Sequence, residues 1–212
     1  MPKQEAPLSH LNSFLPPGTY TAVEEYLKFY KIHLTVTQHR KSILGDYRHR
    51  TGFKNHRISV NGSLNKYSFL ITLLHEIAHL LTFEKYGNKI MAHGNEWKIL
   101  YASLLKQFID NKIFPIDIEK ELLLSLKNPA ASSCAEDELI RVLRKYDTNT
   151  NGYRLVEELP SNALFKIDDG KVFKKGEKQR KRFKCVEVAT GRVFLFSPVY
   201  EVELIKTDSF LN

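Results

Sequence analysis

Apolar residues follow two different rhythms along this chain, and each rhythm predicts one kind of element. Apolar residues spaced three and four apart predict helices over residues 21–30, 66–86, 95–109, 116–126 and 133–146. Alternation of β-branched or aromatic residues with polar ones predicts strands over residues 32–36, 43–47 and 57–60. After residue 163 only strand patterns remain, with hairpin turns expected at 168–170 and 190–191 and a last strand over 199–204. The whole pattern predicts an α+β protein.

The helix predicted over residues 66–86 has hardly any polar face. Asn65 is a suitable N-cap and Gly87 a suitable C-cap. Between them Leu, Ile, Phe and Ala occur on all sides, which is typical of a helix buried in the core of a domain. The polar exceptions in its middle are His75, Glu76 and His79. These three side chains need partners, because burying an unpartnered polar group costs roughly 2–7 kcal/mol.

Changes in the pattern of apolar and polar residues divide the chain into three parts. Residues 1–128 hold most of the predicted helices and the first strands. Residues 129–162 begin at a proline, contain a capping box from Ser133 to Glu136 and end in a polar, turn-rich stretch, so we expect a helical linker. Residues 163–212 contain the hairpin patterns, and we expect a small antiparallel β domain there.

The composition is that of an ordinary globular protein: 212 residues, 42% hydrophobic and 26% charged. No apolar run is long enough to span a bilayer, and the first residues lack the apolar core of a signal peptide, so we expect a cytoplasmic protein. The two cysteines, Cys134 and Cys185, form no CxxC pair. A disulfide framework and a four-cysteine zinc site are therefore excluded, and both thiols are expected to be reduced.

The formal net charge of +8 is concentrated in one segment. Residues 171–184 contain eight Lys or Arg against one Glu. Such a cluster favours a polyanion, so single-stranded DNA is an expected partner, with Phe173 and Phe183 stacking on its bases. The candidate contacts are Lys174, Lys175, Lys178, Arg180, Lys181 and Arg182. A solvated basic surface without a ligand is the alternative interpretation.

Residues 75–79 read His-Glu-Ile-Ala-His, which is the pattern H-E-x-x-H. Residues four apart share one face of a helix, so His75 and His79 can bind one Zn²⁺ ion. Glu76 can reach a water on that ion and act as a general base. The pattern therefore predicts a zinc metallopeptidase that hydrolyses peptide bonds in a protein or peptide substrate.

A catalytic zinc ion usually has three protein ligands and one open position. The extended pattern with Gly at position 82 and His at position 85 is absent, because Thr82 and Lys85 occupy those positions. The third ligand can be His93, Glu96 or, less suitably because it lies on the same helix, Glu84. We favour His93, because imidazole suits zinc and the chain must turn back just before it. Glu96 stays open as the alternative.

The run LLHEIAHL, followed further along by HGNEWK, resembles the SprT-like family of zinc metallopeptidases. The strands at 44–48 and 57–61 resemble its preceding hairpin, so the resemblance covers residues 20–125. It implies a zincin-like catalytic domain, in which a small sheet packs on the H-E-x-x-H helix. It also implies His75, His79 and His93 as ligands of one Zn²⁺ ion and Glu76 as the catalytic acid/base. The related Spartan proteases cleave proteins crosslinked to DNA, which implies DNA-associated proteins as substrates.

The C-terminal part departs from the family pattern. Many SprT-like proteins carry a C-terminal zinc ribbon built on paired cysteines, whereas only Cys185 lies in the C-terminal strands of this chain. We therefore expect a small β unit that resembles a zinc ribbon but holds no metal. The alternative function is a non-catalytic nucleic-acid-binding or regulatory protein with a structural zinc site. Glu76 argues against it, because a structural site needs no base.

Several other side chains have simpler interpretations. His49 and His56 lie in a basic loop and are expected to be solvated or to face an anion, not to bind a metal. Tyr47, Tyr86 and Tyr101 could each stabilise an oxyanion, but core packing is the expected role of these residues and of Trp97.

Overall fold

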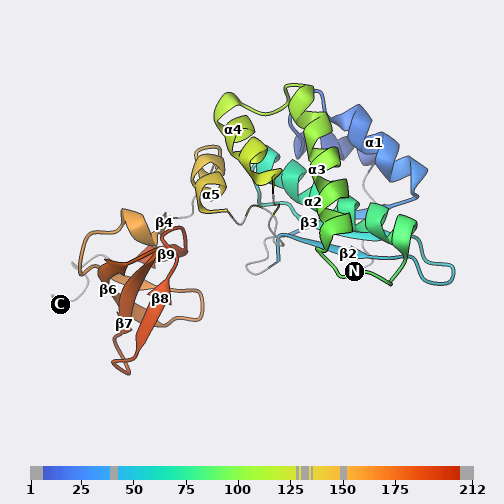
Figure 1. Ribbon diagram of the computed structural model, residues 1–212. Helices are drawn as coiled ribbons and strands as arrows, with labels where there is room; N and C mark the ends of the chain where they lie inside the picture. The colour runs from blue at the N-terminus through green and yellow to red at the C-terminus, as the bar shows by residue number, and fades with distance from the viewer. Residues whose placement is uncertain are drawn as a thin grey trace. The chain divides into compact units, whose positions relative to one another are not determined.

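The computed structural model describes residues 7–38, 43–127, 129, 134, 136–148 and 152–205 and shows two compact units (Figure 1). The first unit is Met1–Asp147 and the second is Thr148–Asn212. Helices and sheets are both present, so the α+β class is confirmed.

The first unit is mainly helical and contains one small sheet. Its elements are η1 (Leu8–Ser13), α1 (Tyr20–Phe29), β1 (His33–Thr37), β2 (Gly45–Arg48), β3 (Arg57–Asn61), α2 (Lys66–Tyr86), α3 (Asn95–Asp110), α4 (Ile116–Ser125) and α5 (Asp137–Arg144). The sheet has the order β1-β3-β2, with β1 parallel and β2 antiparallel to β3. Helix α2 packs against β2 and β3 and against α3, and Ile58 and Val60 of β3 are buried in the same core (Figure 1).

Helix α2 begins and ends where its caps predict. The side chain of Asn65 accepts hydrogen bonds from the backbone N–H groups of Tyr67 (3.1 Å) and Ser68 (2.9 Å). Gly87 follows the last turn with a φ of 66°, a backbone conformation that favours glycine. Nearly the whole helix between the caps is buried, as the apolar pattern predicted. No helix among the described residues is long and apolar enough to cross a membrane.

The boundary between the units differs from the predicted one. Leu139 and Leu143 of α5 are buried in the core of the first unit, and Tyr146 donates a hydrogen bond to Asp117 of α4 (2.8 Å). The residues expected to form a linker, 129–162, therefore contribute α5 to the first unit and a strand, β4, to the second. The apolar face of α5 explains the difference, because it needs a core to cover it.

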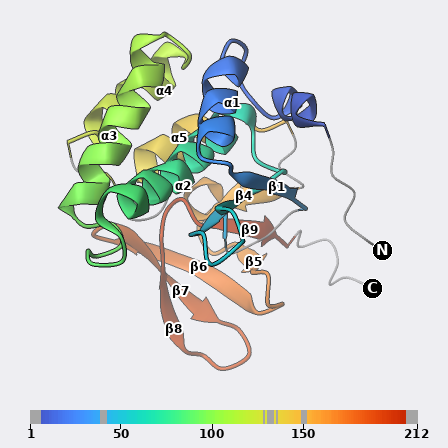
Figure 2. The same ribbon diagram turned by 90° about the vertical axis from the view of Figure 1, so that its right-hand side faces the viewer.

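The second unit contains a single antiparallel sheet of six strands, more than the two predicted hairpins. Its order is β4-β9-β5-β6-β7-β8 (Figure 2). The elements are β4 (Tyr153–Leu155), η2 (Val156–Glu158), β5 (Leu164–Lys166), β6 (Val172–Gln179), β7 (Arg182–Glu187), β8 (Val193–Phe196) and β9 (Glu201–Leu204). A bulge interrupts the β6–β7 pairing at Gly176, where a Cβ atom would collide with the carbonyl oxygen of Lys184.

An apolar cluster holds the second unit together. Phe165, Phe173 and Phe196 contact one another with ring centroids 4.9–5.7 Å apart. Cys185 is fully buried beside them and has the environment of a small apolar residue. Aromatic packing thus fills the interior of this unit, and the expected resemblance to a zinc ribbon stays a prediction.

Lys175 is an exception within the basic segment 171–184. It is 5% exposed, and its ammonium group donates hydrogen bonds to the carbonyl oxygens of Leu159 (2.6 Å) and Glu157 (3.2 Å). The same group lies 4.4 Å from the centre of the Phe183 ring, and burial lowers its pKa. The structure corrects the prediction that Lys175 contacts a nucleic acid, because its charge faces the inside of the unit.

We expect Lys175→Met to destabilise the second unit by about 1–3 kcal/mol, because it leaves buried carbonyl oxygens without a donor. Lys174→Met, the matched exposed neighbour, should change stability by less than about 0.5 kcal/mol. The stability of the second unit in both variants is measured by urea unfolding of the full chain, monitored by amide hydrogen exchange in β6 and β7. Equal stability of the two variants would show that the Lys175 hydrogen bonds contribute nothing.

Candidate metal centre

The structure brings His75, His79 and His93 together. His75 and His79 lie one turn apart on α2, and His93 precedes α3. The Nε2 atom of His75 is 3.2 Å from that of His79 and 3.3 Å from that of His93. Among the described residues, these three form the group whose ligand atoms all lie within 4.8 Å of one another. Glu84 and Glu96, the two alternatives considered from the sequence, are not members of it.

The distances from Nε2 of His75 to the other two nitrogens fit a tetrahedral metal ion. Zinc–nitrogen bonds are about 2.0–2.1 Å long, and two ligands on a tetrahedron of that size lie about 3.3 Å apart. The measured separations of 3.2 and 3.3 Å agree with this value. Three imidazoles pointing their Nε2 atoms at one another without an ion would crowd three polar atoms around one point.

The electrostatic surroundings keep the imidazoles neutral, which is the form that binds a metal. Burial, followed by the charges of His79 and His93, lowers the pKa of His75 to about 3. Burial and then His93 lower the pKa of His79 to about 4. Burial also lowers the pKa of His93. At neutral pH the group therefore offers three lone pairs and no competing protons.

The backbone of His93 is in a left-handed conformation, with a φ of 66°. For a residue with a side chain this conformation costs about 1–2 kcal/mol. The turn is held by the N–H of Gly94, which donates to the carbonyl oxygen of Met91 (3.0 Å). Glycine at position 93 would remove the strain but also the imidazole. The strained residue is thus the one that completes the group, which is typical of a functional position.

Trp97 forms an apolar wall behind the three histidines. Its ring centroid is 4.7 Å from that of His75, 5.3 Å from that of His79 and 4.8 Å from that of His93. Tyr101 stacks on Trp97 at 4.9 Å and also contacts the edge of His75 at 5.5 Å. Trp97 is fully buried, so it has the packing role expected from the sequence. No hydrogen-bond partner for His75 Nδ1 or Trp97 Nε1 lies within the described residues.

Glu76 lies next to this group and is 5% exposed. Strand β2 passes over it at Gly45. A Cβ atom on Gly45 would lie 2.5 Å from Oε1 of Glu76 and 2.7 Å from a methyl carbon of Thr72. Glycine is therefore required at position 45 so that the strand can lie against the carboxylate. This close approach places Glu76 between α2 and β2.

A polar network lies beside His79. It was not predicted from the sequence. The hydroxyl of Tyr47 lies 2.9 Å from Nδ1 of His56, and Nε2 of His56 lies 3.3 Å from Oε1 of Glu84. Arg50 pairs with the same carboxylate oxygen at 3.3 Å. The Tyr47 ring is parallel to that of His79, 6.4 Å away. Glu84 therefore supports the wall of the site and is not one of the grouped ligands.

His56 is 3% exposed and faces the carboxylate of Glu84, so of the two expected environments, solvated or facing an anion, the structure shows the second. Burial lowers its pKa, and the charge of Glu84 opposes that effect. A sequence signal for this was present: His56, Ile58 and Val60 alternate along β3, so they share one face of the strand. His49 is half-buried, and its ring stacks on that of Phe83 at 4.5 Å.

Comparison with known families identifies the first unit. Residues 19–119 match the SprT-like family. The first unit contains a SprT-like domain. This confirms the resemblance stated from LLHEIAHL and HGNEWK, and the family carries a possible metallopeptidase-like role. No curated protein and no solved structure matches the chain.

The basic segment of the second unit lies outside the match to the SprT-like family. Lys174, Lys178, Arg180, Lys181 and Arg182 are exposed, as a nucleic-acid contact would require. Phe173 is buried, and the half-buried Phe183 ring has the ammonium groups of Lys175 and Lys178 at 4.4 and 5.7 Å from its centre, so neither ring is a fully exposed stacking surface. The nucleic-acid contacts therefore stay a prediction that rests on charge alone.

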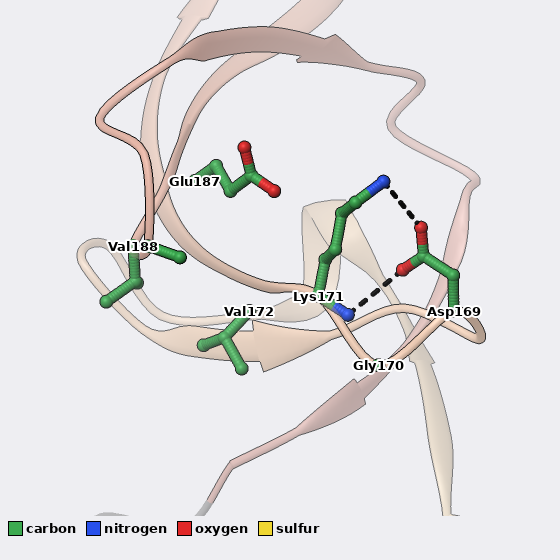
Figure 3. Close-up of a pocket in the computed structure, with 7 residues that line it drawn as sticks. Asp169, Gly170, Lys171, Val172, Glu187 and Val188 are labelled. Atoms are coloured by element: carbon green, nitrogen blue, oxygen red, sulfur yellow. Dashed lines mark hydrogen bonds and ion pairs between the residues drawn. The ribbon is translucent and has the colours of Figure 1, made fainter.

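A pocket of about 500 Å³ in the second unit is lined by the turns at 169–172 and 187–189 (Figure 3). Its charged groups already have partners within the unit. Asp169 accepts hydrogen bonds from the backbone N–H of Lys171 (3.0 Å) and from its ammonium group (2.8 Å). Glu187 accepts a hydrogen bond from Thr190. The pocket thus has no reactive group comparable to those of the SprT-like domain.

We expect His93→Ala to weaken zinc binding by about tenfold or more, because it removes one of three ligands. Glu96→Gln and Glu84→Gln should leave the zinc affinity within about threefold of wild type. Competition of the apoprotein with a chelating dye measures all three. Loss of zinc in Glu96→Gln, with binding retained in His93→Ala, would identify Glu96 as the third ligand.

We expect the metal-free protein to lose stability as the pH falls below about 6.5, the ordinary pKa of histidine. Below that pH the unfolded chain binds protons at these histidines, while the folded chain keeps His79 neutral to about pH 4 and His75 to about pH 3. Above about pH 6.5 neither the folded nor the unfolded chain binds protons at these histidines, so they no longer make the stability depend on pH. Urea midpoints in chelator at several pH values should fall less steeply for His79→Asn. Equal slopes would show that His79 is not held neutral.

Proposed function

We propose that the SprT-like domain is a zinc-dependent endopeptidase. His75, His79 and His93 would hold the ion, and Glu76 would be the general base. The observation that supports this most directly is the grouping of three Nε2 atoms within 4.8 Å of one another beside a buried carboxylate, with two of the separations at 3.2 and 3.3 Å. A zinc ion there would act as a Lewis acid and lower the pKa of a bound water toward neutrality.

Glu76 is the side chain that would transfer the protons in this reaction. Its carboxylate would accept a proton from the attacking water and return that proton to the leaving amine, so that one group serves as base and then as acid. Burial between α2 and β2 keeps bulk water from the carboxylate and fixes its direction. Such fixed placement is what makes proton transfer effective, because geometry precedes pKa in general-base catalysis.

The substrate would lie along β2. In the order β1-β3-β2, the central strand β3 has both edges occupied, whereas β2 has one edge beyond which no described strand pairs. An extended peptide added to this edge would pass the carboxylate that Gly45 contacts. Backbone pairing of this kind gives affinity with little preference for sequence. A broad specificity for unfolded or extended protein segments is therefore part of the proposal.

DNA-associated proteins are the substrates that the exposed cations of the second unit would favour. Lys178, Arg180, Lys181 and Arg182 lie at the β6–β7 turn and could contact phosphate groups without any base stacking. The competing function is a non-catalytic nucleic-acid-binding protein with a structural zinc site. The buried Glu76 weighs against it, because a structural site would gain nothing from an ionisable group at this position.

The test is cleavage of fluorescent casein by the zinc-loaded protein, compared with Glu76→Gln and Gly45→Ala. Glu76→Gln should lower the rate by about 10²–10⁴-fold while zinc content stays the same. Gly45→Ala should also lower it without loss of zinc, because the added methyl group displaces the carboxylate. A basic protein bound to single-stranded DNA serves as the second substrate.

The outcomes separate the two functions. Cleavage that needs Glu76 supports the endopeptidase, and a further increase with DNA supports DNA-associated substrates. Zinc-loaded wild type that cleaves neither substrate, or cleaves both as slowly as Glu76→Gln, contradicts the endopeptidase and favours the structural zinc site.

A further inference from the structure

Strand β8 is the last strand of the second sheet. It pairs with β7 on one side, and no described strand pairs with its other edge (Figure 2). The N–H of Glu187 donates to the carbonyl of Arg192 (2.9 Å), which makes these residues a hydrogen-bonded pair. Because such pairs alternate in an antiparallel ladder, the backbone groups of Val193 and Leu195 point to the open edge. Two donors and two acceptors are therefore presented for a further strand.

The sequence of β8 does not protect this edge. Proteins usually cover an edge strand or place lysine, proline or a bulge on it. β8 reads Val-Phe-Leu-Phe and contains no charge and no proline. Val193 and Leu195 are each 52% exposed, and Val186, directly opposite Val193 on β7, is 37% exposed. These three side chains form an aliphatic surface beside the open edge.

Unpaired cations flank this aliphatic surface. Lys184 lies opposite Leu195, and Lys174 of β6 lies opposite Val186. Arg182 follows on the same face of β7, two residues before Lys184. All three side chains are exposed, and none makes an ion pair with another described residue. The face that surrounds the open edge is thus apolar near the edge and positive beside it.

We propose that the β8 edge binds an extended protein segment in which every second side chain, on the face it shares with Val193 and Leu195, is apolar or acidic. The segment would add as a seventh strand, and its backbone would pair with Val193 and Leu195. Its apolar side chains would cover the aliphatic surface, and its carboxylates would reach Lys184, Lys174 and Arg182. This site is independent of the proposed peptidase activity and lies in the other unit of the chain.

The composition of the face favours such a peptide over a nucleic acid. Single-stranded nucleic acids are bound by aromatic rings on which bases stack. The exposed side chains among these cations are aliphatic, and the nearby Phe173 is buried. A nucleic acid would neutralise the cations but would leave Val193 and Leu195 uncovered. An acidic, apolar strand accounts for both the charges and the exposed aliphatic groups.

The probe is a capped peptide of about ten residues, the upper range of ordinary strands. Every second position is Val or Glu in turn, and the positions between them are Thr, so that Val and Glu lie on one face. Binding to the full chain is measured by fluorescence polarisation. Leu195→Ser and Lys184→Glu should each weaken it by about tenfold. Lys127→Glu, an exposed site in the first unit with the same change of charge, is the matched control and should have no effect. The same peptide with alternate backbone N-methyl groups should bind at least about tenfold more weakly, because it cannot pair on one edge.

Several results would overturn the proposal. One is equal binding of the N-methylated peptide, or of a Lys-Val peptide, because strand pairing or charge would then play no part. Tighter binding of an oligothymidylate that Leu195→Ser does not change would assign the face to nucleic acid. Sedimentation that shows a dimer lost in Leu195→Ser would assign the edge to a second copy of the chain. Unchanged peptide binding in Leu195→Ser, with a native circular dichroism spectrum, would exclude the β8 edge.

Discussion

The burial of one imidazole and one carboxylate in an otherwise apolar helix, with two half-buried imidazoles beside them, is the constraint on which the first unit depends. His75 and Glu76 are almost fully buried in α2, where uncompensated polar groups are costly. The surrounding elements are arranged to meet that cost. Strand β2 covers Glu76, Trp97 packs behind the histidines, and the turn before α3 returns His93 to the same point. The three histidines could hold a metal ion, which would be a common partner for their lone pairs.

Several local features lower the stability of the first unit but keep the histidines and Glu76 in place. His93 accepts a left-handed backbone, and the N–H of Trp97 is buried without a described partner. Gly45 leaves β2 without a side chain at the point where it meets α2. Each feature makes sense only with respect to the site, because an apolar core of the same size would need none of them. The fold and the candidate site are therefore not separable in this unit.

The sequence predicted what local signals determine. The bounds of α2 followed from Asn65 and Gly87, and His75 and His79 followed from helical spacing, whereas preferring His93 to Glu96 relied on the family pattern as well. The partners of β9, which lies between β4 and β5, could not be predicted, because they are distant along the chain. Lys175 was misassigned although alternation along β6 places it on the same face as Phe173, since a lysine in a basic run is normally solvated.

The N-cap of α2 has a wider consequence. Besides accepting from two backbone N–H groups, Asn65 donates to the carbonyl oxygen of Leu143 (3.0 Å) and to the carboxylate of Asp147 (2.7 Å). The first turn of the helix that carries the histidines is therefore hydrogen-bonded to residues 143 and 147. Both lie beyond residue 119, where the match to the SprT-like family ends. A fragment that ends at residue 119 would lose both hydrogen bonds of Asn65 and would expose the core that Leu139 and Leu143 cover. The helix that carries the histidines is thus held by the whole first unit, up to Asp147, and not by the family-matched segment alone.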